Sequence, residues 1–266
     1  PRQAIFGFAG ADCDAFLNVS KASNCIELPL STCYRCPSGH VALVNKIFPE
    51  IPIVAKKDAI QGKIHYIKNR QIAENLRNED LIISRTTAPL VSLCIKLISE
   101  GIAAKVKGCD IGAQLAKEIA SIDPEPSTES YSAFILLKNH YMKNQTKKYE
   151  YLDNKDQMIA SLQDRCSAIE AVYLARTSLG NSLELQQAIK DLFSDEKAPI
   201  TLATCHRTKG LEADRVFLYN ADIMPLKWKN QGAWQYTQEE NLLYVALTRA
   251  KQEMYIVSDK RPNWLP

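Results

Sequence analysis

Short continuous apolar runs alternate along the first half of the chain with apolar residues at helical spacing. Intervals of three and four predict amphipathic helices at 38–48 and 88–100. Four short apolar runs predict strands at 51–54, 64–67, 81–84 and 102–106. Strands that alternate with helices are typical of a parallel, doubly wound sheet. The pattern therefore predicts an α/β fold.

The pattern changes at 123–130, where two prolines in Asp-Pro-Glu-Pro-Ser-Thr-Glu-Ser disfavour both helix and strand. Helical periodicity without a convincing strand follows at 130–143, 155–178 and 183–194. Apolar, β-prone runs return at 200–204 and 216–219. We therefore predict an all-helical insertion at 124–198 within the α/β domain.

Two polar segments near the end of the chain predict a site. Thr-Cys-His-Arg-Thr-Lys-Gly-Leu-Glu at 204–212 follows a predicted strand, and open α/β sheets bind ligands at strand ends. In Glu-Glu-Asn-Leu-Leu-Tyr-Val-Ala-Leu-Thr-Arg-Ala at 239–250, apolar residues recur at helical intervals. Thr237 and Glu240 have the spacing of a capping box and predict where this helix starts. Arg249 then falls near its end, so a His, a Lys, a Glu and an Arg are expected on neighbouring sheet-edge elements.

Composition narrows the function classes only slightly. The 266 residues are 46% hydrophobic and 24% charged, which is ordinary for a globular protein. The net charge of +3 is compatible with a nucleic-acid partner but does not require one. No apolar run approaches the ~18 residues that span a bilayer, and the start lacks a signal-peptide pattern. We expect no membrane association and a cytoplasmic location.

Eight cysteines raise the question of a metal site. Cys33 and Cys36 form a C-x-x-C, but a zinc site usually needs a second such pair. Cys13 and Cys25 lie twelve residues apart and do not supply one. We therefore favour reduced, mostly buried thiols over a metal or redox role and predict no metal site.

The segments at 204–212 and 239–250 closely resemble motifs V and VI of the UvrD/Rep-type superfamily 1 DNA helicases, roughly T-x-H-x-x-K-G-L-E and E-E-x-x-L-x-Y-V-A-x-T-R-A. Pro-Arg-Gln-Ala-Ile-Phe-Gly-Phe-Ala-Gly-Ala-Asp at the start is similar to motif III. Leu-Ser-Thr-Cys-Tyr-Arg-Cys at 30–36 is similar to motif IV, L-x-x-N-Y-R-S, and Leu-Ile-Ile-Ser-Arg-Thr-Thr at 81–87 to the next strand–helix unit. Four motifs in order, two of them long, make the resemblance specific.

The resemblance implies a RecA-like, P-loop NTPase-type parallel sheet flanked by helices. The implied domains are the tail of a first RecA-like domain at 1–22, the second RecA-like domain at 23–123 and 199–266, and a helical accessory insertion at 124–198. In the family, the phosphate-binding loop G-x-x-x-x-G-K-[ST] and the Asp-Glu magnesium box precede motif III, and this sequence contains no such loop. ATP with Mg²⁺ is thus expected to bind mainly on an N-terminal RecA-like domain, and this chain alone is expected not to hydrolyse ATP.

The resemblance also implies half of a nucleotide site. Its candidates are catalytic Arg35, Arg249 and Gln3 and cofactor-binding Tyr34, Glu212 and Gly210. A planar guanidinium can bind two γ-phosphate oxygens at once, which suits Arg35 and Arg249. Gln3 is expected near the γ-phosphate, Tyr34 against adenine and Glu212 at the ribose hydroxyls. The alternatives are a helix-end cation for Arg249, a half-buried core ring for Tyr34 and a surface ion pair for Glu212.

A second set of residues is expected to contact single-stranded DNA. Its members are Phe6, Phe8, Thr204, His206, Thr87 and Lys209. Phe6 and Phe8 share a face of an extended segment, as the motif's base-stacking aromatic pair would, although two core phenylalanines are the alternative. Thr204 and His206 are candidate backbone contacts, and Thr87 stands where relatives often have Asn. Lys209 either contacts phosphate or is a solvated turn residue.

The sequence hence predicts the motor half of an ATP-dependent DNA helicase or translocase that works with its own N-terminal RecA-like domain. Gln-Ala-Ile-Phe, in place of the Q-L-P-P of the related 5′-to-3′ branch, favours movement from 3′ to 5′. Two alternatives stay open: a non-catalytic nucleic-acid-binding or regulatory module with this fold, and part of a helicase–nuclease.

Overall fold

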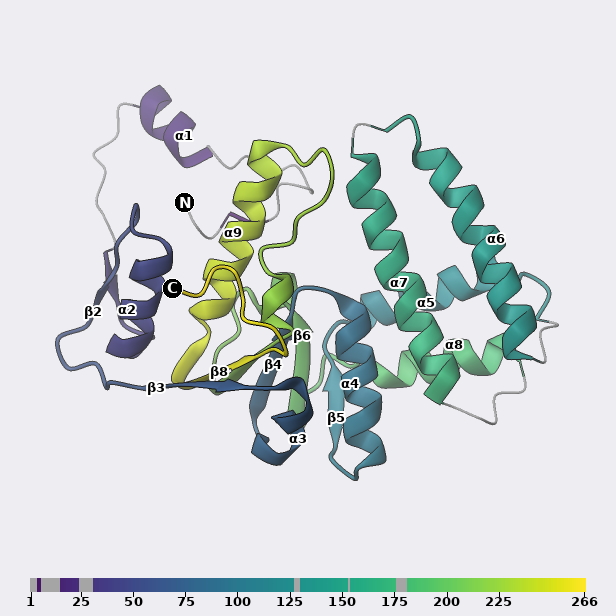
Figure 1. Ribbon diagram of the computed structural model, residues 1–266, viewed down its shortest axis with the longest axis horizontal. Helices are drawn as coiled ribbons and strands as arrows, with labels where there is room; N and C mark the ends of the chain where they lie inside the picture. The colour runs from purple at the N-terminus through teal and green to yellow at the C-terminus, as the bar shows by residue number, and fades with distance from the viewer. Residues whose placement is uncertain (1–3, 6–14, 24–30, 127–129, 153, 176–180) are drawn as a thin grey trace. The chain divides into compact units, whose positions relative to one another are not determined.

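A computed structural model describes residues 4–5, 15–23, 31–126, 130–152, 154–175 and 181–266. The chain divides into two compact units (Figure 1). Unit 1 comprises Pro1–Arg85, Cys205–Lys227 and Gln231–Pro266, and unit 2 comprises Thr86–Thr204 and Trp228–Asn230. The predicted residues Gln3, Phe6, Phe8, Cys13 and Cys25 lie outside the described part of the chain.

Unit 1 is built on four parallel strands in the order β3-β8-β7-β4. These strands are β3 (Lys63–Ile67), β4 (Asp80–Ser84), β7 (Ala213–Tyr219) and β8 (Ala250–Val257). A separate two-stranded parallel sheet pairs β1 (Thr32–Cys33) with β2 (Val54–Ala55). The helical elements of this unit are α1 (Ala15–Ser23), α2 (Ser38–Ile47), η2 (Asn69–Gln71), α3 (Ile72–Asn75), η3 (Cys205–Thr208), η4 (Ala221–Ile223) and α9 (Ala233–Leu247).

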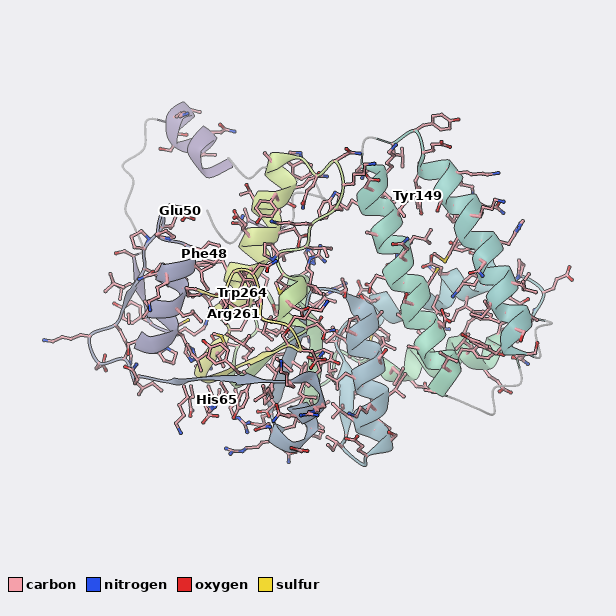
Figure 2. The ribbon with its side chains drawn as sticks, viewed as in Figure 1. Phe48, Glu50, His65, Tyr149, Arg261 and Trp264 are labelled. Atoms are coloured by element: carbon pink, nitrogen blue, oxygen red, sulfur yellow. The ribbon has the colours of Figure 1, made fainter. Side chains whose placement is uncertain are left out.

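The central strands of unit 1 are apolar because both of their faces are covered. Ile82, Phe217 and Val257 are fully buried, as expected for a parallel sheet with helices on its faces. Aromatic contacts extend this core towards the edge strand. The Tyr255 ring stacks on Phe217, with 4.2 Å between ring centroids. It also stacks at 4.4 Å on His65 of β3, which is labelled in Figure 2.

Helix α9 is an interior helix of unit 1. Every residue from Asn241 to Leu247 is buried, so the helix is covered on all sides and not on one stripe. Tyr244 meets the ring of Phe48 edge-on at 5.7 Å (Figure 2). The start of the chain also contacts this helix, because the Asn241 side chain donates a hydrogen bond of 2.9 Å to the Ala4 carbonyl. The second half of α9 is consequently enclosed by the rest of unit 1.

Unit 2 combines two parallel strands with five helices among its described residues. Its elements are α4 (Thr87–Ser99), β5 (Ala104–Val106), α5 (Cys109–Ile122), α6 (Tyr131–Tyr149), α7 (Lys155–Ala175), α8 (Ser182–Leu192) and β6 (Ile200–Thr204). Helix α4 packs on α7, and α5 packs on α8. Arg165 of α7 and Glu118 of α5 form a bidentate ion pair, with 2.6 Å at its shorter contact. This pair joins α7, which lies within the predicted insertion, to α5, which precedes it.

The main sheet has six strands, and its recorded pairs are parallel. A parallel sheet flanked by helices confirms the predicted α/β, RecA-like fold class. The predicted helices at 38–48 and 88–100 correspond to α2 and α4. Among the described residues, no helix combines the length and apolar character needed to cross a membrane.

Two sequence-based expectations are wrong. The apolar run at 51–54 is not a strand of the main sheet, because only Val54–Ala55 is extended and it pairs with β1. The Thr237–Glu240 capping box does not start α9. The helix begins one turn earlier, where the Gly232 N–H donates 2.8 Å to Gln235 Oε1, and Thr237 lies inside it, with Oγ1 donating to the Ala233 carbonyl. The Thr237–Glu240 spacing predicted the wrong start because the Gln235 side chain already accepts from the backbone N–H of Gly232, about one turn upstream.

The N-terminus of α4 provides a stability test. Asp164 of α7 accepts from the backbone N–H groups of Thr87 at 2.8 Å and Ala88 at 2.9 Å, which otherwise lack helical partners. We expect Asp164→Ala to lower the free energy of unfolding by about 1–2 kcal/mol, measured by urea titration. Asp191→Ala, which loses one exposed contact with Gln187, is the matched control, and an equal effect of both variants would contradict this role.

Candidate functional site

Glu212 holds two cations at one edge of unit 1. Its Oε2 lies 2.5 Å from Arg35 Nε, and its Oε1 lies 2.6 Å from Lys251 Nζ. The hydrogen bonds from Lys251 and Arg35 keep the pKa of this carboxyl below its usual range. All three side chains are about one-third exposed or more, so this cluster is open to a ligand. The predicted surface ion pair of Glu212 is thus present, and its partner is the other predicted residue Arg35.

Arg249 lies beside this cluster but is 3% exposed. Its Nε donates to the Val245 carbonyl at 2.8 Å and its Nη1 to the Leu211 carbonyl at 3.2 Å. Burial, together with the charge of Arg35, lowers the pKa of Arg249. Two guanidinium groups close enough to repel each other form an environment that favours an added anion. Arg249 has at the same time the structural helix-end role that was considered as its alternative.

Strand register explains why these residues converge. Ala213 at the start of β7 pairs with Ala250 at the start of β8, and the Ala213 N–H donates to the Arg249 carbonyl at 3.2 Å. The residues just before the two strands, Glu212 and Arg249, are therefore neighbours. Arg35 arrives from the turn between β1 and α2, where its Nη1 also reaches the Thr248 carbonyl at 3.5 Å.

Tyr34 and Gly210 flank the same cluster in sequence. The Tyr34 side chain is 78% exposed, so the alternative of a half-buried core ring is wrong, and its face is open to a ligand. Gly210 has φ of +89°, a conformation that side chains rarely adopt. This turn brings the chain from η3 to Glu212, so Gly210 positions its neighbours through its backbone.

A second polar cluster lies at Glu239, near the middle of α9. Arg85, just after β4, forms a bidentate ion pair with Glu239, with contacts of 2.7 and 2.5 Å. Both side chains are largely buried, and the Leu226 N–H also donates to Glu239 at 3.2 Å. His206 of η3 lies within the electrostatic influence of Arg85. Burial lowers the pKa of His206 to about 3, assisted by the charges of Arg85 and Arg207, so its ring is neutral.

The expectation of one shared site for the His, Lys, Glu and Arg is thus wrong for His206. Strands β4 and β7 are parallel. Arg85 follows the carboxyl end of β4, whereas Glu212 precedes the amino end of β7, so the two residues lie at opposite ends of the strands. Glu239 and Arg249 are ten positions apart along α9 and its cap, which corresponds to about 15 Å of helix. The segment 204–212 therefore runs from the end of the strands where His206 lies to the opposite end, where Glu212 lies.

The remaining strand-contact candidates are placed as follows. Thr204 is buried at the end of β6, and Lys209 is exposed in the turn after η3. Thr87 is the first residue of α4, and its backbone N–H is bound to Asp164. The neutral ring of His206 can exchange hydrogen bonds with a phosphate or sugar but adds no charge to the interaction.

Sequence reasoning missed Arg85, Glu239 and Lys251. The first two belong to the quoted segments Ile-Ser-Arg-Thr-Thr and Glu-Glu-Asn-Leu, but nothing in either segment indicates that they pair across 154 residues. Lys251 follows the predicted Arg249 by two residues. Alternation along a strand would place both side chains on one face, and this signal could have identified Lys251.

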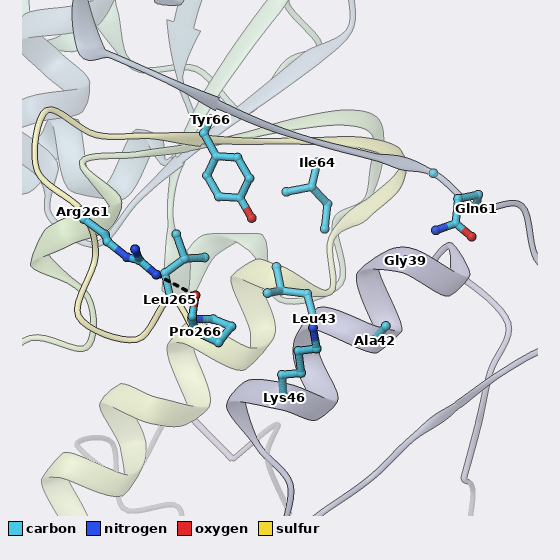
Figure 3. A pocket seen from close by; sticks show the side chains of 11 residues that line it. Gly39, Ala42, Leu43, Lys46, Gln61, Ile64, Tyr66, Arg261, Leu265 and Pro266 are labelled. Atoms are coloured by element: carbon cyan, nitrogen blue, oxygen red, sulfur yellow. Dashed lines mark hydrogen bonds between the residues drawn. The ribbon is translucent and has the colours of Figure 1, made fainter.

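A cavity of about 660 Å³ lies elsewhere in unit 1, between α2, β3 and the last residues described (Figure 3). Its lining includes Leu43, Ile64, Tyr66 and Arg261, the last of which donates to the Pro266 carbonyl at 2.7 Å. It contains none of the candidate residues named above. Across the described ranges, no group of three or more His, Cys, Asp or Glu side chains could hold a metal ion.

Comparison with known proteins relates most of this chain to one family of helicase domains. Residues 53–261 match the family model described as the UvrD-like helicase C-terminal domain. The chain is 42% identical over 86 residues to the probable DNA helicase II homolog of Mycoplasma pneumoniae, covering 31% of this chain and 12% of that protein. It is 37% identical over 73 residues to the ATP-dependent DNA helicase PcrA of Bacillus subtilis, covering 27% and 10%.

The F-box DNA helicase protein 1 of Schizosaccharomyces pombe is 42% identical over 76 residues, which cover 27% of this chain and 8% of that protein. The aligned segments thus span about a tenth of the length of these relatives.

The low pKa of His206 predicts a pH effect on stability. Its folded pKa, about 3, lies below the ordinary 6.5, so the unfolded chain binds a proton that the folded chain excludes. The stability linked to this group is present above pH 6.5 and is lost as the pH falls towards 3. Over that window we expect His206→Gln to reduce the slope of unfolding free energy against pH by up to about 1.4 kcal/mol per pH unit.

Urea titrations at several pH values measure this slope. His140→Gln, on the exposed surface of α6, is the control. A slope that is the same in the His206 variant and the natural chain would show that the imidazole is solvated and not buried.

Proposed function

Because the chain belongs to the UvrD-like helicase C-terminal domain family, we propose that it is the motor half of an ATP-dependent DNA helicase or translocase. The observation that carries this proposal is the convergence of Arg35, Glu212 and Arg249 just outside the amino ends of β7 and β8. An ATP-binding RecA-like domain of the same protein would supply the phosphate loop and the Mg²⁺ ligands. This chain by itself would not hydrolyse ATP.

The ion pairs support a specific order of events. Arg35 is bound to Glu212 through an exposed contact of 2.5 Å, which solvent screens and a stronger anion can replace. The γ-phosphate of ATP, which offers several charged oxygens, would take over the guanidinium of Arg35. Glu212 would then be free to accept from the ribose hydroxyls, and the exposed ring of Tyr34 would cover the adenine. Gln3 would contact the γ-phosphate from the motif III segment.

Arg249 would act as the second guanidinium. Three of its five N–H donors are used within unit 1, by Val245, Leu211 and Thr248. These bonds orient its plane, and the phosphate would attract the remaining donors. Charge develops on the γ-phosphate oxygens in the transition state, which is where a positioned guanidinium lowers the barrier.

Movement would follow from different affinities of the two nucleotide states for a DNA strand. Thr87, Thr204, His206 and Lys209 would contact the sugar–phosphate backbone, while Phe6 and Phe8 would stack on unpaired bases. Closure on ATP would shift this grip, with a 3′-to-5′ direction by resemblance. A single DNA strand and the protein's own N-terminal domain are thus the proposed partners.

One observation favours a second function, a non-catalytic nucleic-acid-binding module. Arg249 is buried and hydrogen-bonded within its own unit, which suffices to explain its presence without ATP. The two functions differ in whether the full-length protein hydrolyses ATP and in whether that hydrolysis depends on the guanidinium groups.

The decisive variants are Arg35→Ala and Arg249→Ala in the full-length protein. We expect DNA-stimulated ATP hydrolysis to fall by roughly 10³-fold for a lost arginine finger, with single-strand binding retained. Arg70→Ala, which removes an exposed arginine of η2, is the matched control. Because Arg249 is buried, the ATP turnover of its variant is interpreted only if the thermal unfolding midpoint is preserved. Arg35 is partly exposed, so the ATP turnover of its variant is interpreted in either case. Unchanged turnover in the Arg35 variant would remove Arg35 from the mechanism, and an absence of DNA-stimulated ATP hydrolysis in the natural full-length protein would favour the non-catalytic module.

Base stacking is tested separately with Phe8→Ala. Stacking on an aromatic ring is worth roughly 1–3 kcal/mol per base, so we expect a 5- to 150-fold weaker dissociation constant for a labelled oligo(dT), measured by fluorescence anisotropy. Tyr66→Ala removes an exposed ring of β3 and serves as the control. Equal affinities of the two variants would place Phe8 in the core instead.

A further inference from the structure

The C-x-x-C sequence adjoins the nucleotide half-site. Cys33 ends β1, and Cys36 lies two residues before α2 begins at Ser38. The Cys36 N–H donates to Cys33 Sγ at 3.4 Å, and the Cys36 thiol lies within hydrogen-bonding reach of both the Cys33 sulfur and the Thr248 carbonyl. Cys33 is half-buried, whereas Cys36 is 3% exposed. One sulfur is therefore accessible, and the second lies directly behind it.

The two thiols differ in their chemistry. The hydrogen bond from the Cys36 thiol, with backbone N–H donors of Cys36 and Arg35, lowers the pKa of Cys33 to about 5. The same thiol contact and burial raise the pKa of Cys36. The charge of the Arg35 guanidinium also favours a negative sulfur at Cys33. A reactive thiolate beside a protonated thiol is the arrangement of a nucleophile and its resolving partner.

We propose that Cys33 and Cys36 form a redox site that a hydroperoxide converts into an intrachain disulfide. The Cys33 thiolate attacks the terminal oxygen of the hydroperoxide, the O–O bond breaks, and the departing alkoxide takes a proton from water. Cys33 is then a sulfenic acid. The Cys36 sulfur attacks the Cys33 sulfur, and the S–O bond breaks. The hydroxide leaves with the Cys36 proton as water. Two electrons pass from the pair of thiols to the peroxide.

The other described cysteines do not share these features. Cys94, Cys166 and Cys205 are buried, and burial raises the pKa of each to about 12, so these three remain protonated and unreactive. Cys109 is exposed, but its sulfur contacts the Phe193 carbonyl at 3.9 Å and the Asp195 carboxylate, and no second cysteine among the described residues is recorded beside it. Among the six cysteines that the structure describes, the chemistry is therefore specific to Cys33 and Cys36.

Arg35 links this site to ATP. It lies between the two cysteines in sequence, and its guanidinium and the Cys36 thiol both reach the Thr248 carbonyl, at 3.5 and 3.6 Å. Disulfide formation removes the Cys36 donor and constrains the turn that carries Arg35. The oxidised protein would then hydrolyse ATP more slowly, a consequence that rests on the proposed function, whereas the disulfide itself does not.

Hydrogen peroxide treatment of the full-length protein, followed by peptide mass spectrometry, tests the site. We expect the peptide containing residues 33–36 to lose two hydrogens and to regain them with dithiothreitol. Cys36→Ser should instead accumulate a sulfenic acid at Cys33 that dimedone captures, and Cys33→Ser should give neither product. Alkylation of Cys33 by iodoacetamide at pH 6 should be roughly tenfold faster than that of a model thiol of pKa ~8.5, since its larger thiolate fraction outweighs its lower nucleophilicity. Failure to form the disulfide in the natural protein would overturn the site.

ATP turnover distinguishes the two proposals. The natural protein should lose at least half of its activity on oxidation and recover it on reduction, while the double variant Cys33→Ser, Cys36→Ser should keep its activity in peroxide. Cys109→Ser is the matched control and should respond like the natural protein. A disulfide that forms without changing ATP turnover would refute the link through Arg35 and leave the redox site intact.

Discussion

The parallel pairing of β7 with β8 is the constraint on which the candidate site depends. It places the residues before both strands side by side, so Glu212 meets Lys251 and the Arg249 carbonyl accepts from Ala213. Because these backbone positions are held by two buried strands, the side chains that project from them need little further ordering before they bind an anion. Arg35 then completes the cluster from a turn that belongs to a different sheet.

The cations at this site differ in burial: Arg35 and Lys251 are partly exposed, whereas Arg249 is buried. Arg35 and Lys251 share one carboxylate, that of Glu212, in the recorded ion pairs. The exposed cations are exchangeable, whereas Arg249 is fixed by backbone carbonyls at 2.8 and 3.2 Å. A site that combines one rigid and one movable guanidinium can bind a phosphate without first paying the full ordering entropy of two long side chains. The thiols of Cys33 and Cys36 adjoin the movable one.

Helix α9 connects two sets of polar groups with different chemistry. Near its middle, Glu239 neutralises Arg85 in a largely buried pair that also contacts the loop at Leu226. Just after its end, the buried Arg249 lies beside the exposed Arg35–Glu212–Lys251 cluster. The helix is buried along most of its length. Under the proposed function, it would connect the strand contacts to the nucleotide contacts.

The sequence by itself determined those elements whose cause is local. The apolar runs that became β4 and β6 and the periodic segments that became α2 and α4 are examples, as is the chemical identity of the charged residues in the family motifs. Only the tertiary structure decided which of those residues meet. Arg35 and Glu212 are separated by 177 positions, and parallel pairing sent His206 and Glu212, six residues apart, to opposite edges of the sheet. Side-chain periodicity follows from the geometry of one strand or helix, whereas a convergent site depends on the register between strands, which no single segment encodes.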